Sequence, residues 1–206
     1  MLKIWGRISS INVRKAVLAA REIGLVFERI EAGGSFGIVR TPEYLARNPN
    51  GLVPLLQDGD VELWESNVIV RYLCARYAPG TLYPDALALR FDAERWMDWQ
   101  QTTLNPAGRT AFMQWIRTPA ERRDAEAIAK SVAATEPLMA LLDEHLSRRP
   151  FMAGDRLTMA DLPIACELHR WMGLPQERPE RPHLDRWYKG VAERPSSRGV
   201  LDIELV

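Results

Sequence analysis

Apolar runs and segments of helical periodicity alternate along the first third of the chain. Residues 2–5 and 26–30 have the length and composition of short buried strands. Between them, apolar side chains recur at helical spacing over residues 11–23, and Gly24 is suited to end that helix. We therefore expect the chain to begin with a strand–helix–strand unit, which is typical of an α/β sheet.

A short helix, a hairpin and a further helix should follow. The dipeptide Thr41-Pro42 is a favourable helix start. Apolar runs at residues 54–57 and 61–63 flank Asp58-Gly59, which predicts a tight β-hairpin. Apolar positions four residues apart, continuing to Tyr77, then predict a helix. The expected order of elements is β-α-β-α-β-β-α.

Strand signals end after residue 85, and the rest of the chain has helical patterns. Residues 86–117 should be helical, with a kink or a split at Asn105-Pro106, because proline removes a backbone donor. Apolar positions spaced alternately four and three residues apart over residues 128–146 predict a long helix, kinked at Pro137.

Two shorter helices complete the prediction. Thr158 to Asp161 resembles a capping box, so we interpret Asp161 as structural, and a weaker pattern predicts a helix over residues 183–192. The linker should lie between residues 79 and 86. We therefore expect an α/β domain at residues 1–79 and an all-α domain at residues 86–206.

Composition and cysteine count favour a cytoplasmic protein but exclude few classes of function. The 206 residues carry 27 basic and 27 acidic side chains, a balance that gives no support to a nucleic-acid or membrane partner. Cys74 and Cys166 are too few for a disulfide-stapled secreted protein, and the first residues lack a signal-peptide pattern. The three histidines lack metal-ligand spacing, so we expect no metal.

Four motifs resemble the cytosolic glutathione transferase superfamily in their order and spacing. They are Asn50-Gly51-Leu52-Val53-Pro54, Leu63 to Ile69, Phe151 to Asp155, and Thr158 to Asp161. The resemblance covers essentially the whole chain. It implies a thioredoxin-like domain followed by an α-helical bundle, glutathione as co-substrate, and a homodimer.

The resemblance assigns the glutathione site to two segments. It implies a cis Val53–Pro54 bond whose backbone faces the cysteine of glutathione, and it places Glu65 and Ser66 at the γ-glutamyl end. Local chemistry agrees, because a helix N-terminus suits a carboxylate and Glu65 could take the ammonium group. The plainer interpretation is that Glu and Ser are simply favourable in a first helical turn.

The group that activates the thiol should lie between the first strand and the first helix. No Tyr or Cys is available there, which favours a serine-type enzyme. The family offset points to Ser10; Asn12 and Ser9 are alternatives, and both serines could instead cap the helix. Leu52 replaces the Lys or Gln of many relatives, so Arg40 is a candidate for the glycine carboxylate, or a plain surface residue.

The second substrate should bind between the domains, against an aromatic helix face. Trp96, Trp99, Thr103 and Phe112 are the candidates, although an aromatic stripe is more often core. The expected reaction is conjugation of glutathione to a small apolar electrophile. The alternatives are a glutathione-dependent isomerase of the maleylacetoacetate type and a non-catalytic binding or regulatory protein.

Overall fold

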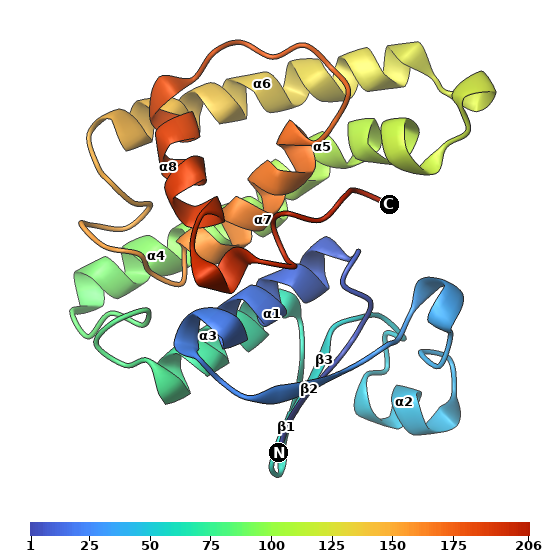
Figure 1. The fold of residues 1–206 in the computed structure, drawn as a ribbon, viewed down its shortest axis with the longest axis vertical. Coiled ribbons are helices and arrows are strands. Elements are labelled where there is room, and N and C mark those ends of the chain that lie inside the picture. Colours follow the sequence, from blue (N-terminus) through green and yellow to red (C-terminus); the bar gives the residue numbers. More distant parts are fainter.

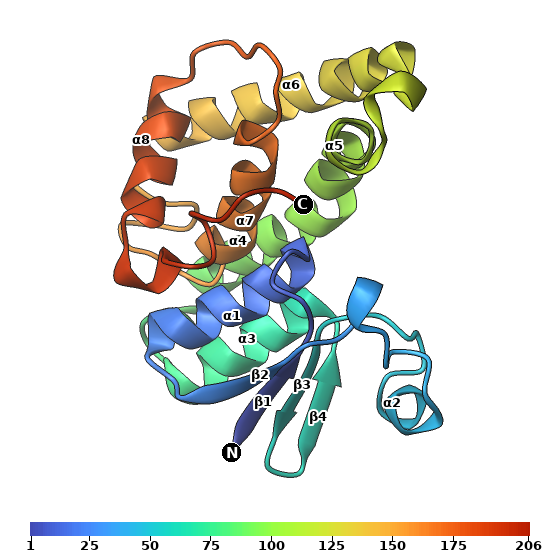
Figure 2. The same ribbon diagram turned by 45° about the vertical axis from the view of Figure 1, so that its right-hand side comes forward.

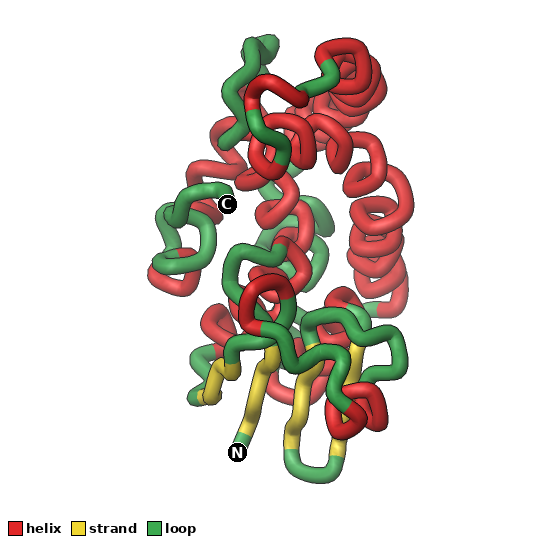
Figure 3. The backbone as a smooth tube through the Cα atoms, turned by 90° about the vertical axis from the view of Figure 1, so that its right-hand side faces the viewer, coloured by secondary structure: helices red, strands yellow, loops and turns green.

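A four-stranded sheet lies at one end of the molecule, and helices fill the other end (Figure 3). The computed structural model describes residues 1–206. The strands are β1 (Leu2–Trp5), β2 (Phe27–Ile30), β3 (Leu55–Asp58) and β4 (Val61–Trp64). Their order across the sheet is β2-β1-β3-β4; β1 and β2 are parallel, and the other two pairs are antiparallel. The predicted order of elements is confirmed.

Different helices cover the two faces of the sheet (Figure 2). The helices of this half are α1 (Ile11–Ile23), α2 (Pro42–Arg47) and α3 (Ser66–Tyr77). Ile4 and Leu56 are fully buried in the main core with α1 and α3, whereas Trp5 and Leu55 pack with Tyr44 of α2. Neighbouring strand residues serve opposite faces because successive side chains alternate across a strand.

The helical half is continuous with the sheet half through α1. Its helices are α4 (Leu87–Trp99), α5 (Asn105–Phe112), α6 (Ala125–Ser147), α7 (Asp161–Met172) and α8 (Pro182–Ala192). Helix α1 packs against α3 on one side and against α7 on the other (Figure 1). One buried core therefore spans both halves.

Neither predicted proline site splits a helix. A π-helical segment at residues 100–104 joins α4 and α5 into one unbroken path through Pro106, and a second one at residues 113–117 extends α5. We attribute this to the wider π turn, which accommodates a residue without an N–H. Pro137 lies inside an uninterrupted α6. Pro137 and Ala133 are both exposed, so water can reach the carbonyl that the proline frees.

The structure differs from the sequence prediction at the start of the second strand and in three short 3-10 segments. Val26 was expected in the second strand but is 92% exposed and precedes β2. The 3-10 segments, which the apolar pattern does not indicate, are Gly34–Phe36, Ala120–Arg122 and Pro195–Ser197. No helix in the chain combines the length and the apolar character needed to cross a membrane.

Asp161 ties three segments of the helical half together. Its carboxylate is fully buried and accepts hydrogen bonds from Met152 N (3.0 Å) and from the Trp187 indole (2.8 Å) on Oδ1. Oδ2 accepts from the backbone N–H (2.8 Å) and the hydroxyl (3.3 Å) of Thr158. The predicted structural role is consistent with these contacts, although α7 begins at Asp161 itself.

Asp161→Asn should destabilise the protein by about 3 kcal/mol. The amide NH2 would replace one carboxylate oxygen, and it would face buried N–H or O–H donors whose hydrogen bonds it cannot accept. The free energy of unfolding is measured by urea titration. Asp155→Asn, at an exposed position in the preceding loop, is the matched control and should change it by less than about 0.5 kcal/mol. Equal effects of the two substitutions would contradict the role of Asp161.

Candidate functional site

Ser10 stands at the N-terminus of α1, where the two halves of the molecule meet. It is the N-cap residue, with φ −80° and ψ 124°, but its side chain makes no capping hydrogen bond. A helix N-terminus presents unpaired N–H groups and the positive end of the helix dipole. The Ser10 hydroxyl is therefore available to a ligand at a position that stabilises an anion.

One pocket adjoins the N-terminus of α3. It is lined by Asn12, Asn48, Asn50, Leu52, Val53, Pro54, Trp64, Glu65 and Ser66. The Val53–Pro54 bond is cis, as expected. Glu65 has φ 70° and ψ 110°, an unfavourable conformation for a residue with a side chain, which is typical of functional sites. The structure thus gathers five of the predicted residues in one pocket.

Asn12 and Ser66 connect the two helix N-termini within this pocket. The Ser66 hydroxyl donates to Oδ1 of Asn12 at 3.2 Å. Because the Asn12 carbonyl oxygen is engaged in this way, its amide N–H groups remain free to donate to a ligand. Asn12 therefore remains a competitor of Ser10 for the role of thiol activator.

The backbone of Leu52 is fixed by two side chains that the sequence analysis did not single out. Its carbonyl accepts hydrogen bonds from the Tyr44 hydroxyl (2.7 Å) and from Nδ2 of Asn48 (2.8 Å). The Leu52 side chain is 63% exposed. No local sequence pattern indicates that Asn48 supports the segment before the cis-proline.

Arg40 lies next to this segment without lining the pocket. A side chain added at Gly51 would place its Cβ 2.8 Å from Nη1 of Arg40, so the two residues are neighbours. Arg40 is exposed. Its guanidinium group is thus close enough to the pocket to reach a ligand that extends past Gly51.

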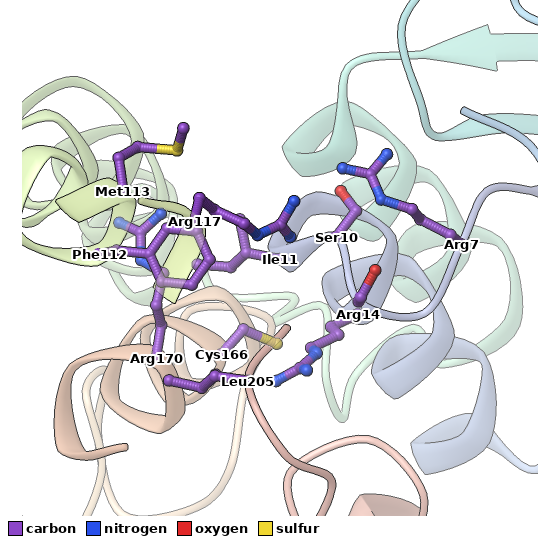
Figure 4. Close-up of a pocket in the computed structure, with 11 residues that line it drawn as sticks. Arg7, Ser10, Ile11, Arg14, Phe112, Met113, Arg117, Cys166, Arg170 and Leu205 are labelled. Carbon is purple, nitrogen blue, oxygen red and sulfur yellow. The ribbon is translucent and has the colours of Figure 1, made fainter. Parts of the chain in front are cut away.

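A second cavity, of about 140 Å³, lies between the two halves (Figure 4). It is lined by Arg7, Ser9, Ser10, Ile11, Arg14, Phe112, Met113, Arg117, Cys166, Arg170 and Leu205. Ser10 in this cavity and Asn12 in the first pocket are two residues apart, so both pockets reach the start of α1. A thiolate held there would face a second substrate.

Of the predicted second-substrate residues, only Phe112 lines this cavity. Trp96 is buried, with its ring centroid 5.3 Å from that of Trp99 and 4.5 Å from that of His145. Thr103 is exposed and lies outside the lining. The two tryptophans pack within the helical half, and the helical periodicity that suggested them could not separate core from cavity.

The four arginines of the cavity were not predicted. Arg7 and Arg14 come from the first loop and α1, and Arg117 and Arg170 come from the end of the α5 path and from α7. Their positions in the sequence share no local pattern. Only the packing of α1 against the helical half brings them together.

The cysteines do not supply a nucleophile. Cys74 and Cys166 are both free and buried, and burial raises the pKa of each thiol to about 12. Cys166 borders the cavity but is protonated at neutral pH. No group of three or more His, Cys, Asp or Glu residues is placed so as to bind a metal ion.

A thioredoxin-like sheet with a cis-proline near the start of α1, joined to a helical half, is the architecture of the glutathione transferase class. The family models for the N-terminal and C-terminal domains of glutathione S-transferase match residues 1–75 and 106–195. The chain therefore belongs to the glutathione S-transferase family.

Individual relatives match over the full length. Glutathione S-transferase GstB of Escherichia coli (strain K12) is 44% identical, with all of both chains covered. Glutathione S-transferase 3 of Zea mays is 31% identical, covering 95% of this chain and 90% of the relative. A theta class glutathione S-transferase of Xanthomonas axonopodis pv. citri, solved with glutathione bound, has a TM-score of 0.96 and 44% identity, covering 100% and 99%.

A buried lysine lies close to both pockets. Lys15 is fully buried in α1, and its ammonium group donates to Oε1 of Gln101 at 2.8 Å. Burial lowers the pKa of Lys15 from 10.5 to about 8, although the Glu167 and Glu65 carboxylates oppose this shift. The folded protein therefore releases this proton more readily than the unfolded chain does.

Lys15 should make stability increase with pH between about pH 8 and 10.5, because the unfolded chain binds the extra proton in that window. The free energy of unfolding of the wild type, relative to Lys15→Met, should rise by about 3 kcal/mol across it. Urea titrations at several pH values measure this difference. Lys130→Met, at an exposed position, should show no such trend, and the same slope in both variants would contradict the prediction.

Proposed function

We propose that the protein conjugates glutathione to a small electrophile and that the N-terminus of α1 holds the thiolate. The observation that carries this proposal is the uncommitted Ser10 hydroxyl at the start of α1, which both pockets reach. The bound glutathione in the Xanthomonas relative supports the choice of co-substrate. In this arrangement Ser10 and the first N–H groups of α1 face the sulfur.

The γ-glutamyl end of glutathione is assigned to the start of α3. The Ser66 hydroxyl and the N–H groups of the first turn would take its α-carboxylate, since a helix N-terminus favours anions. The Glu65 carboxylate would take the ammonium group. The positive φ of Glu65 supports this assignment, because such a conformation is retained where a side chain has to be held in one place.

Stabilisation of the thiolate sets the chemistry. A free thiol has a pKa of about 8.5 and is mostly protonated at neutral pH. A charge-assisted hydrogen bond contributes about 1.5–3 kcal/mol and a helix N-terminus about 0.3–1 kcal/mol. Together they would bring the pKa of the glutathione thiol to between about 5.5 and 7. The thiolate is then the main species at neutral pH.

The reaction itself needs only this anion and a positioned electrophile. The thiol proton passes to solvent, the sulfur lone pair forms the new carbon–sulfur bond, and the leaving group departs with its electron pair. The product is a thioether. Holding both reactants in adjoining pockets lowers the entropic cost of bringing them together.

A homodimer and a cytoplasmic location complete the proposal. Arg71 of α3 forms an ion pair with Asp98 of α4, so the surfaces of these helices adjoin. On that surface the apolar side chains of Val68 and Phe91 are 42% and 63% exposed, and a second copy of the chain would cover them.

The cytoplasmic location is supported by the cysteines, because two buried free cysteines suit a reducing compartment.

Arg40→Gln should raise KM for glutathione about tenfold if Arg40 binds the glycine carboxylate, because a charge-assisted hydrogen bond is lost. The dipeptide γ-glutamylcysteine, which lacks that carboxylate, should keep its KM. Steady-state kinetics with both thiols make the comparison. An equal change for the two thiols, or no change for either, would remove Arg40 from the site.

Ser10→Ala should raise the apparent pKa of the pH–rate profile by about one to two pH units and lower kcat/KM at neutral pH about tenfold or more. Profiles with a generic aryl halide and glutathione measure both effects. Asn12→Ala and Ser9→Ala are the matched variants. A shift in one of them but not in Ser10→Ala would transfer the role. Absence of turnover in the wild type, despite glutathione binding, would indicate a binding protein.

A further inference from the structure

The cavity between the two halves carries an excess of positive charge. Four of its eleven lining residues are arginines, and none is Asp or Glu. Lining arginines are often neutralised by carboxylates just outside a cavity. Their partners therefore decide whether the charge is available to a ligand.

The guanidinium groups of Arg7 and Arg117 have no charged or hydrogen-bonding partner within the chain. Neither guanidinium group forms an ion pair or a hydrogen bond, and the two side chains extend toward one another across the cavity, with Ser10 drawn between them in Figure 4. Burial and the nearby charge of Arg7 lower the pKa of Arg117. No carboxylate offsets this repulsion, so two like charges are held together in the folded protein.

Local packing keeps both side chains in place. The Arg7 side chain lies against the start of the first 3-10 segment, where a Cβ at Gly34 would lie 3.2 Å from its Cδ and Cζ. The guanidinium carbon of Arg117 lies 5.5 Å from the centroid of the Phe112 ring. Contacts with a glycine backbone and an aromatic face restrict the guanidinium groups without neutralising them.

Of the other two arginines, Arg170 is neutralised by a carboxylate and Arg14 is not. Arg170 forms a buried ion pair with Glu167. Arg14 donates only to backbone carbonyls, those of Ile8 at 3.0 Å and Glu204 at 3.4 Å, and it is 2% exposed. Three of the four arginines therefore contribute uncompensated charge to the cavity.

Apart from Ser9 and Ser10, the rest of the lining is apolar. Ile11, Phe112, Met113 and Leu205 supply hydrocarbon and ring surface around the arginines. A cavity of about 140 Å³ has room for a small ring or a short chain. An occupant that satisfies both features has a small apolar body and one anionic group.

We propose that the second substrate is a small electrophile bearing a carboxylate, which Arg7 and Arg117 bind while the electrophilic carbon lies toward Ser10. This inference rests on the proposed transferase function. A planar carboxylate matches the donor geometry of guanidinium groups, and it relieves the repulsion between two arginines that the fold holds together. The same pocket disfavours cationic substrates.

A matched pair of aryl halides tests the proposal. In 4-chloro-3,5-dinitrobenzoate and its carboxamide, the thiolate attacks the carbon that bears chlorine, a carbon–sulfur bond forms, and chloride leaves with the bonding electrons. Each kcat/KM at saturating glutathione is divided by the uncatalysed rate constant with glutathione, which removes the intrinsic difference in reactivity. The ratio of the two normalised values reports recognition of the carboxylate.

The wild type should favour the carboxylate about tenfold or more, as expected for one charge-assisted contact. Arg117→Gln should lower this preference about tenfold, and Arg117→Lys should retain part of it. Arg122→Gln removes an exposed arginine five positions away and should leave the ratio unchanged. Thermal melting checks that each variant is folded.

The remaining outcomes separate the two proposals. If neither aryl halide is turned over, the transferase function fails. Turnover of both with equal normalised rates leaves that function intact and overturns the carboxylate proposal. If Arg117→Gln lowers kcat/KM by the same factor for both aryl halides, the charge of Arg117 acts on the thiolate. If it raises KM for glutathione, Arg117 binds the tripeptide. Either result overturns the carboxylate proposal.

Discussion

The packing of α1 against both halves of the molecule is the constraint on which the rest of the structure depends. A surface helix buries one stripe of side chains, but in α1 every residue from Val13 to Ala20 is buried. Helix α3 packs on one side and α7 on the other, so the core has no break between the sheet and the helical half. The N-terminus of α1 is thereby fixed where both pockets reach it.

All-round burial has an electrostatic consequence. Arg14 and Lys15 lie within the buried stretch and cannot reach bulk water, so their charges act on the space between the halves. Lys15 is bonded to Gln101, while Gln100 donates to Glu167 at 2.9 Å. These two hydrogen bonds tie α1 and α7 to the π-helical segment between α4 and α5.

The two pockets divide the chemistry between them. The pocket at the start of α3 is built from backbone turns, a cis-proline and a residue with positive φ, which suits the recognition of a peptide. The interdomain cavity is built from side chains of four separate segments. Under the proposed function, changes in those side chains should alter the choice of second substrate and leave the peptide site undisturbed.

The sequence by itself determined the element order and the structural role of Asp161, because these depend on local periodicity and turn chemistry. The family resemblance predicted the residues that the fold gathers at the start of α3, and it made Ser10 the predicted thiol activator, with Asn12 and Ser9 as alternatives. The tertiary structure decided that Trp96 and Trp99 pack inside the helical half, and that Arg7 and Arg117 converge beside Ser10. Arg7 and Arg117 are 110 positions apart in the sequence, and no local pattern encodes which distant residues will meet. The burial of Trp96 likewise depends on helices packed around it, which local periodicity does not specify.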